Sequence, residues 1–178
     1  MLEVSDSRVL RFPYRGAPQT VDVMRRAALE SANHITVRRL AEEICSGLDS
    51  KDYLSEYIAI YNFMIARTRY MRDPRTVELV RAPHLVCEEI LRGGRPSLDC
   101  DDEGATIGGL VLAVGGRVSF VTMAFRNAFY NGHRQYSHVC ALAQEPSTGQ
   151  QIVLDPVAAE KTRQMLNRAV AFKIWPVA

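Results

Sequence analysis

Apolar side chains in the first part of the chain recur at three- and four-residue intervals, which is the spacing of one helix face. The pattern becomes helical at Thr20, after a lead-in (residues 1–19) whose prolines and glycine favour extended structure. Gly47 marks a stop, and Asp49 or Ser50 can cap the helix that follows. The two clearest apolar faces consist of Val37, Leu40, Ala41 and Ile44, and of Leu54, Tyr57, Ile58, Tyr61 and Ile65.

The middle of the chain breaks this helical pattern. Asp73-Pro74 marks a turn, and the loose alternation over residues 76–80 predicts a short strand. Pro83 then opens a short helix that ends at Gly93-Gly94. A longer helix is expected from about residue 101 to residue 114, where a glycine pair ends it.

The second half is rich in strand-forming residues. Three such runs cover residues 118–125, 136–144 and 150–155, and the EPSTG segment between the last two predicts a hairpin. A final run over residues 170–175 can add another strand. Helices followed by an antiparallel sheet predict an α+β fold, with the N-terminal helices packed on one side of the sheet.

The length of 178 residues suits one domain spanning 1–178. We expect an N-terminal extension with helices over 1–50, a core over 51–157 and a C-terminal segment over 158–178. The net charge of +2 gives no electrostatic reason to expect a nucleic acid or a membrane as partner. Without a signal-peptide pattern or an apolar run long enough to span a bilayer, the sequence predicts a cytoplasmic protein or one carried by a larger assembly.

Four cysteines are spread along the chain without CxxC pairing, which argues against a disulfide framework in such a protein. Cys45 and Cys87 lie on apolar helix faces and are expected in the core. His34 and His84 stand beside helix starts, where surface or capping roles are common. Cys100 differs from these residues, because it is placed where a thiol can react.

The segment LDCDDEGA places Cys100 at the start of a helix. With Asp99 as N-cap, Cys100 takes the first helical position and Asp102 the third, as in a capping box. Backbone N–H groups and the helix dipole favour the thiolate there. The charges of Asp99, Asp101, Asp102 and Glu103 oppose it, so a nearby cation is needed; we expect this acidic cluster to be a solvated helix start rather than a cation site.

His138 can supply that cation from the strand QYSHVCALA, where alternation puts His138, Cys140 and Leu142 on one face. Asp155 ends the next strand, just across the EPSTG hairpin. Antiparallel pairing can bring its carboxylate beside the imidazole, which fixes the tautomer and supports the positive charge. Cys100, His138 and Asp155 thus form a coherent nucleophile, base and orienting group.

In order and spacing these three residues resemble the transglutaminase-like superfamily, which has a papain-like cysteine protease core. Supporting details are the helix after Cys100, the strand motif SHVCAL and the LDPV segment. The resemblance covers roughly residues 60–157, and the stretch from Tyr70 to the LDCDD motif is similar to versions encoded by bacteriophages and prophages. Where the family commonly has His-Ala-Trp, this chain has His138-Val139-Cys140, and its only tryptophan is Trp175.

The resemblance implies an enzyme that attacks amide or ester carbonyls of a protein or peptide through a thioester, without a cofactor or metal. Hydrolysis is slightly favoured over acyl transfer to an amine. Localisation would be the bacterial host cytoplasm or a virion. One alternative is a phage or prophage structural or interaction protein that retains the fold without turnover. Another is a zinc site built from Cys100, His138, Cys140 and a carboxylate.

Overall fold

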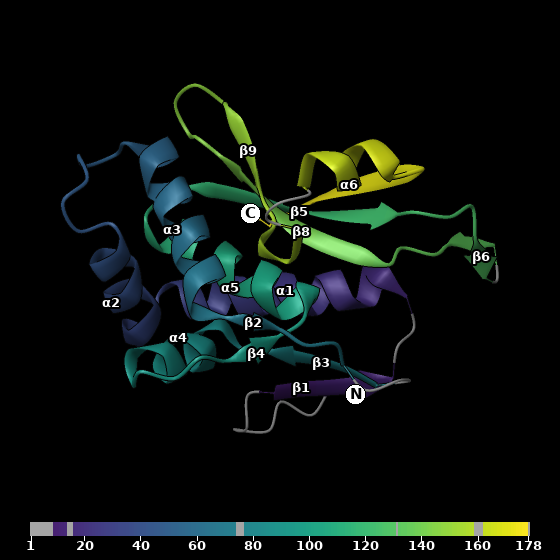
Figure 1. Ribbon diagram of the computed structural model, residues 1–178, viewed down its shortest axis with the longest axis horizontal. Helices are drawn as coiled ribbons and strands as arrows, with labels where there is room; N and C mark the ends of the chain where they lie inside the picture. The colour runs from purple at the N-terminus through teal and green to yellow at the C-terminus, as the bar shows by residue number, and fades with distance from the viewer. Residues whose placement is uncertain (1–8, 14–15, 74–76, 131, 159–161, 178) are drawn as a thin grey trace.

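A four-stranded antiparallel sheet packs against a layer of helices in the computed structural model of the protein (Figure 1). The structure describes residues 9–13, 16–73, 77–130, 132–158 and 162–177. The strand order is β10-β5-β8-β9. Its members are β5 (Arg117–Ala124), β8 (His138–Gln144), β9 (Gln151–Leu154) and β10 (Ala171–Pro176). The mixed helix and antiparallel-sheet composition confirms the predicted α+β class.

One helix, α5 (Cys100–Ala113), lies at the centre of the helical layer, and its residues 101–111 are all buried. A Cβ atom at Gly108 would lie only 3.1 Å from the ring of Phe120 on β5, so a glycine here lets the helix approach the sheet closely. The helices that pack around it are α1 (Ala17–Ala32), α2 (Ile35–Ile44), α3 (Tyr53–Arg67) and α4 (Pro83–Leu91).

The other face of the sheet carries a smaller apolar cluster formed by Val121, Met123, Cys140 and Leu142. Helix α6 (Thr162–Arg168) lies on this side in Figure 1, opposite the helical layer. The prediction that helices cover one side of the sheet therefore holds for the N-terminal helices and not for α6.

Among the described residues, three two-stranded pairs complete the fold, and five of their six strands were not predicted from the sequence. The pair β1–β3 is antiparallel, β2–β4 is parallel, and β6–β7 forms a hairpin that extends beyond the sheet (Figure 1). Only β3 was expected. Their bounds are β1 (Val9–Pro13), β2 (Arg69–Tyr70), β3 (Val77–Arg81), β4 (Ser97–Leu98), β6 (Phe129–Tyr130) and β7 (His133–Arg134). A 3₁₀ turn, Pro156–Ala158, follows β9.

The helical stretch that the sequence predicts from Thr20 is divided in two. It begins at Ala17 and breaks after Ala32, because the ring of His34 accepts a hydrogen bond from the N–H of Thr36 at 3.3 Å and caps α2. The capping role expected of His34 is confirmed. Residues 1–8 and 14–15 of the predicted lead-in lie outside the described residues.

Two other local expectations need correction. Asp52, and neither Asp49 nor Ser50, caps α3: its Oδ1 accepts from the N–H of Ser55 at 3.3 Å. His84 does not cap a helix; its Nδ1 lies 3.1 Å from the Ser31 hydroxyl, and its ring stacks on His34. Pro74 of the predicted turn and Thr76 of the predicted strand lie outside the described residues.

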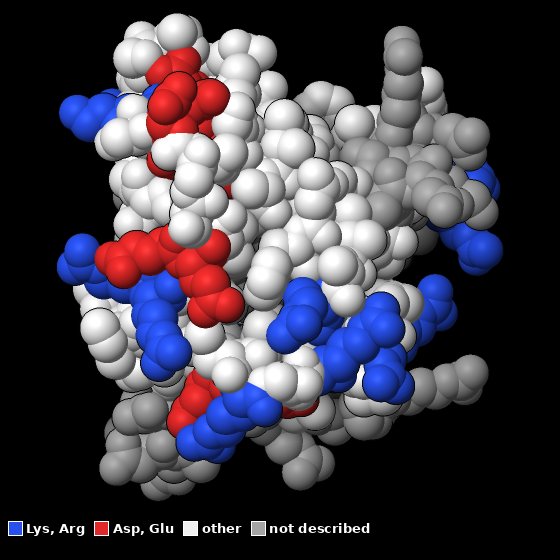
Figure 2. Space-filling model, turned by 60° about the vertical axis from the view of Figure 1, so that its left-hand side comes forward, with Lys and Arg blue, Asp and Glu red and all other residues white. Residues whose placement is uncertain are grey.

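The surface carries no field of a single sign on the side that Figure 2 shows. Acidic side chains gather mainly on the left of this view, in part directly beside basic ones, and a group of basic side chains lies lower down, in keeping with a net charge of only +2. Among the described residues, no helix is both long and apolar enough to cross a bilayer.

Candidate active site

Cys100 is the first residue of α5, and the elements before it fix its position. Oδ1 of Asp99 accepts a hydrogen bond from the N–H of Asp102 at 3.3 Å, which confirms Asp99 as the N-cap. Strand β4, which leads into the cap, pairs with β2, and the N–H of Met71 donates to the carbonyl of Leu98 at 2.8 Å. The N-terminal end of α5, which carries the thiol, is thus fixed by the Asp99 cap and by the pairing of β4 with β2.

Helix α5 packs against β8. A Cβ atom at Gly104 would lie 4.0 Å from the carbonyl carbon of Cys140, and one at Gly108 would contact Phe120, which pairs with Ala141. The first half of α5, which begins at Cys100, therefore lies over the part of β8 that follows His138.

His138 and Asp155 are in direct contact. Nε2 of His138 lies 2.8 Å from Oδ2 of Asp155, and the two residues are 8% and 1% exposed. The antiparallel pairing of β8 with β9 brings the two side chains together, as predicted from the sequence. With Nε2 bonded to the carboxylate, Nδ1 is the ring nitrogen left to exchange a proton with a third group.

An electrostatic interaction relates this pair to the beginning of α5. The charge of Asp155 contributes to raising the pKa of Glu103, which belongs to the same helical turn as Cys100. Residues three apart occupy neighbouring positions on a helix face. The start of α5, the first residue of β8 and the residue after β9 thus meet in one region.

The acidic cluster around Cys100 is buried, which corrects the expectation of a solvated helix start. Asp99, Asp101, Asp102 and Glu103 are each less than a tenth exposed. Asp102 does not complete a reciprocal capping box, because its Oδ1 accepts from the N–H of Arg81 on β3 at 2.6 Å. Burial above all raises the pKa of Asp102 and that of Glu103 to about 7, with neighbouring carboxylates adding to the effect.

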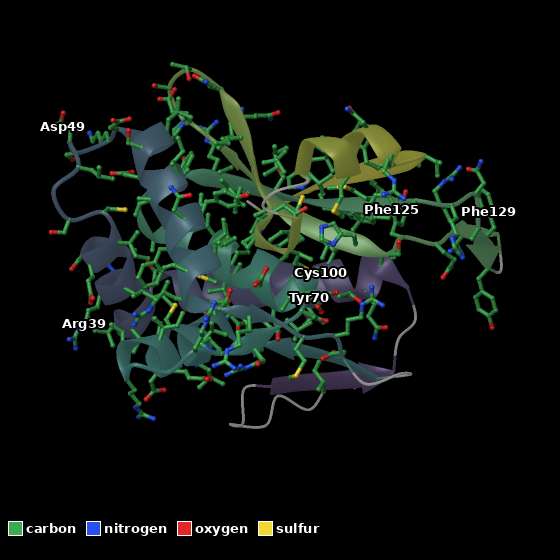
Figure 3. All side chains as sticks on the ribbon, in the orientation of Figure 1. Arg39, Asp49, Tyr70, Cys100, Phe125 and Phe129 are labelled. Atoms are coloured by element: carbon green, nitrogen blue, oxygen red, sulfur yellow. The ribbon has the colours of Figure 1, made fainter. Side chains whose placement is uncertain are left out.

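Two aromatic residues, Tyr70 and Phe125, lie beside the candidate triad and were not predicted from the sequence. Tyr70 lies beside Cys100 in Figure 3, and its hydroxyl is hydrogen-bonded to Arg72. Burial raises the pKa of Tyr70, and the charges of Cys100 and Asp99 add to this shift while Arg72 opposes it. The ring of Phe125 lies 6.5 Å from the ring of His138, centroid to centroid.

The sequence pattern gives little indication that these two aromatic residues lie at the site. Tyr70 reaches Cys100 through a parallel pair only two residues long, for which no pattern exists. Phe125 could have been noticed, because it closes a predicted strand next to the histidine strand. Phe125 is an aromatic neighbour of His138. Position 140 carries a cysteine in place of the tryptophan of the His-Ala-Trp pattern, and the indole N–H of Trp175 donates to the hydroxyl of Thr122 at 2.9 Å.

The other three cysteines have core environments. Burial raises the pKa of Cys45 to about 11 and that of Cys87 to about 12, and burial followed by the charge of Asp155 raises that of Cys140 still further. In the part of the chain that the structure describes, no three His, Cys, Asp or Glu side chains converge as metal ligands. The zinc alternative therefore has no ligand set among these residues.

Comparison with known proteins gives one informative similarity. No family model matches the chain, and no curated protein sequence matches it. Among solved structures, it is similar to the 2.00 Å crystal structure of a protein from Parabacteroides distasonis ATCC 8503 that is described as a putative protease. The TM-score is 0.58 at 11% identity, over 92% of this chain and 30% of that protein. The chain thus shares its fold with less than a third of a larger protein.

Proposed function

We propose that the protein is a cysteine-nucleophile enzyme with a transglutaminase-like, papain-like core, in which Cys100, His138 and Asp155 form the catalytic triad. Its substrate would be an amide or ester carbonyl of a protein or peptide. The observation that carries this proposal is the enclosed 2.8 Å contact between His138, the first residue of β8, and Asp155, which follows β9. The fold shared with a protein described as a putative protease supports the same class of chemistry.

In the proposed reaction, Nδ1 of His138 accepts the proton of the Cys100 thiol and the sulfur attacks the carbonyl carbon. The negative charge that develops on the carbonyl oxygen is stabilised by the N-terminal end of α5. His138 then protonates the departing amine or alcohol, leaving a thioester on Cys100. Water or a second amine, deprotonated by His138, attacks the thioester and regenerates the thiol. Asp155 holds the ring and supports its positive charge throughout.

Hydrolysis is the favoured outcome. Cys100 is half-buried and the neighbouring Tyr70 and Arg72 are exposed, so we take water as the acyl acceptor. Acyl transfer to an amine would need a wall that excludes water, and the residues described around Cys100 give no specific indication of one.

The test is to trap the thioester. An activated acyl ester should acylate wild-type protein at one site, which mass spectrometry should map to Cys100, with a burst of leaving group before slow turnover. The Cys100→Ala and His138→Ala variants should lose the burst, whereas Cys45→Ala should retain it as a matched cysteine control. Acylation spread over several cysteines, or a burst that survives His138→Ala, would contradict the triad.

A second candidate is an interaction protein that keeps the fold without turnover. The observation in its favour is the β6–β7 hairpin, which extends from the sheet and exposes Phe129 and Tyr130 at 59% and 70% (Figures 1 and 3). Arg134 lies over the Phe129 ring at 4.7 Å, so the hairpin presents an aromatic and basic surface. An intact fold with no burst and no selective acylation of Cys100 would favour this role.

A further inference from the structure

Glu103 is a buried carboxyl group that the proposed chemistry does not use. It lies in the first turn of α5, three residues after Cys100, and is 3% exposed. Among the described residues, its Oε2 has no hydrogen-bond partner. Its other oxygen, Oε1, contacts the hydroxyl group of Thr68, the residue that follows α3. An ionised carboxylate in such surroundings has an unusually high energetic cost.

The contacts of the Thr68 hydroxyl indicate where the protons are. Its oxygen lies 2.8 Å from the carbonyl oxygen of Met64 and 2.9 Å from Oε1 of Glu103. A hydroxyl group has one proton, and a carbonyl oxygen can only accept. An ionised Glu103 has to share the single Thr68 proton with the carbonyl of Met64, whereas a protonated Glu103 can donate to Thr68 while Thr68 donates to Met64. This proton count favours a protonated Glu103.

The charges around Glu103 favour the same protonation state. Burial is the largest cause that raises its pKa to about 7, and the charges of Asp155 and Asp99 raise it too, against the hydrogen bond to Thr68. Arg95 approaches this region but donates to the backbone carbonyl of Thr68 at 3.1 Å. The charged and titratable groups in the region are Asp99, Cys100, His138, Cys140, Asp155 and Arg95.

We propose that Glu103 is a positioning residue held as a neutral carboxylic acid, which keeps a second negative charge away from Asp155 and from the Cys100 thiolate. The role assigned to Cys100 rests on the proposed function, whereas the protonation of Glu103 does not. When Glu103 loses its proton, its charge opposes formation of the thiolate. The reactivity of Cys100 then rises less steeply with pH than that of an isolated thiol.

Two measurements on the full chain test this proposal. Infrared difference spectroscopy should show a protonated carboxylic acid band at about pH 6 that disappears in Glu103→Gln. Alkylation of Cys100 by iodoacetamide should proceed in Glu103→Gln within about twofold of the wild-type rate at about pH 6, because glutamine is also neutral and can donate to Thr68. At about pH 8 the variant should react roughly three- to tenfold faster, because the wild-type carboxyl is then ionised.

Asp102→Asn is the matched control. Asp102 lies on the same turn and its pKa is also raised to about 7, but its carboxyl accepts from Arg81 on β3. This variant should leave the carboxylic acid band of Glu103 in place and should give a smaller change in the alkylation profile. An equal or larger gain at about pH 8 in Asp102→Asn would overturn the specific role of Glu103.

Other outcomes also separate the possibilities. Two results would overturn the proposal: absence of the band at about pH 6, or a more than about tenfold slower alkylation of Glu103→Gln at that pH. Either result means that Glu103 is charged in the wild-type site. Should Glu103→Gln fail to fold, Thr68→Val provides the test: loss of the hydroxyl should shift the band, and an unshifted band overturns the proposal. Should Cys100 react no faster than an ordinary thiol in any variant, the proposed enzyme function fails while the band still reports on Glu103.

Discussion

Nε2 of His138 lies 2.8 Å from Oδ2 of Asp155, and both side chains are almost completely enclosed. His138 opens β8 and Asp155 directly follows β9, so the pairing of these two strands sets the contact. Oδ1 of Asp155 has no hydrogen-bond partner in the part of the chain that the structure describes, so the imidazole is the polar group bonded to this side chain there. A buried carboxylate with one such partner depends strongly on it.

Substitution of Asp155 should therefore separate orientation from charge. Asp155→Asn keeps a hydrogen-bonding side chain of the same size but cannot support imidazolium, so we expect at least a tenfold loss of Cys100 acylation with modest loss of stability, on the order of 1 kcal/mol. Asp155→Ala should lose the same activity and about 2–4 kcal/mol of unfolding free energy, because the histidine is left buried without its partner. Ester burst kinetics and urea titration check the two effects. Full acylation in Asp155→Asn would contradict the orienting role.

The end of α5 provides a test of packing away from the site. A Cβ atom at Gly116 would lie less than 3 Å from several atoms of the Tyr57 ring and hydroxyl group, and that hydroxyl donates to the carbonyl of Gln144 at 3.0 Å. We expect Gly116→Ala to lower the unfolding free energy by about 2–3 kcal/mol, because Tyr57 is fully buried and cannot move aside.

Gly104→Ala is the contrasting variant. Its Cβ would meet the flexible end of Met24 at 3.1 Å, and alanine favours a helix over glycine by about 1 kcal/mol. The two effects should nearly cancel, leaving the stability within about 1 kcal/mol of wild type. Urea titration checks both variants: equal destabilisation would contradict the tolerance expected at Gly104, and an unchanged stability of Gly116→Ala would contradict the close approach to Tyr57.

Stability should fall as the pH rises from acid to neutral. The pKa of Asp102 is raised from 3.8 and that of Glu103 from 4.5, in both cases to about 7, so the folded chain retains protons that the unfolded chain has released. Their stabilising effect is complete below the unfolded values and is lost by about pH 7. Each group costs about 1.4 kcal/mol per pH unit up to its folded pKa, so we expect the unfolding free energy to drop by roughly 5 kcal/mol between about pH 5 and pH 8. Urea titrations at several pH values, with Glu103→Gln showing a smaller drop, check this. A flat profile would contradict the burial of protonated carboxyls.

The aromatic neighbour of His138 can be compared with one on the β6–β7 hairpin. Phe125→Ala should reduce acylation of Cys100 by roughly three- to tenfold, because the imidazole loses a ring that restricts its movement. Phe129→Ala is the matched control, since Phe129 is exposed and contacts Arg134 on the hairpin. Equal losses in both variants would indicate that the hairpin belongs to the substrate-binding surface.

The sequence predicted the main elements of the fold because their signals are local. The helix that begins at Cys100, its cap at Asp99 and the hairpin between β8 and β9 follow from residue types and spacing. The two-residue strands β2, β4, β6 and β7 are too short to produce a pattern. Their pairing depends on segments far apart in the chain, or on a hairpin without a clear turn signal.

For the candidate site, the sequence predicted that Asp155 would lie beside His138, and it did not predict the burial of the acidic cluster. A run of four acids within five residues usually indicates solvent exposure. Here β3 and the segment after α3 cover the helix start, and Arg81 and Thr68 supply the polar contacts. Alternation along β8 groups His138 with Cys140 and Leu142, and these two residues pack on the α6 side of the sheet. The distance between His138 and Cys100 therefore depends on the position of α5 relative to β8, which the strand pattern does not predict.

The most direct test of the central claim is the pH dependence of Cys100 alkylation in wild-type protein and in His138→Ala, measured residue by residue with mass spectrometry. A thiol that shares a proton with His138 should react well below the pH at which a free cysteine ionises, near 8.5. Its profile should move upward by at least about one pH unit when the imidazole is removed. Superimposable profiles in the two proteins would contradict the proposed pairing of Cys100 with His138.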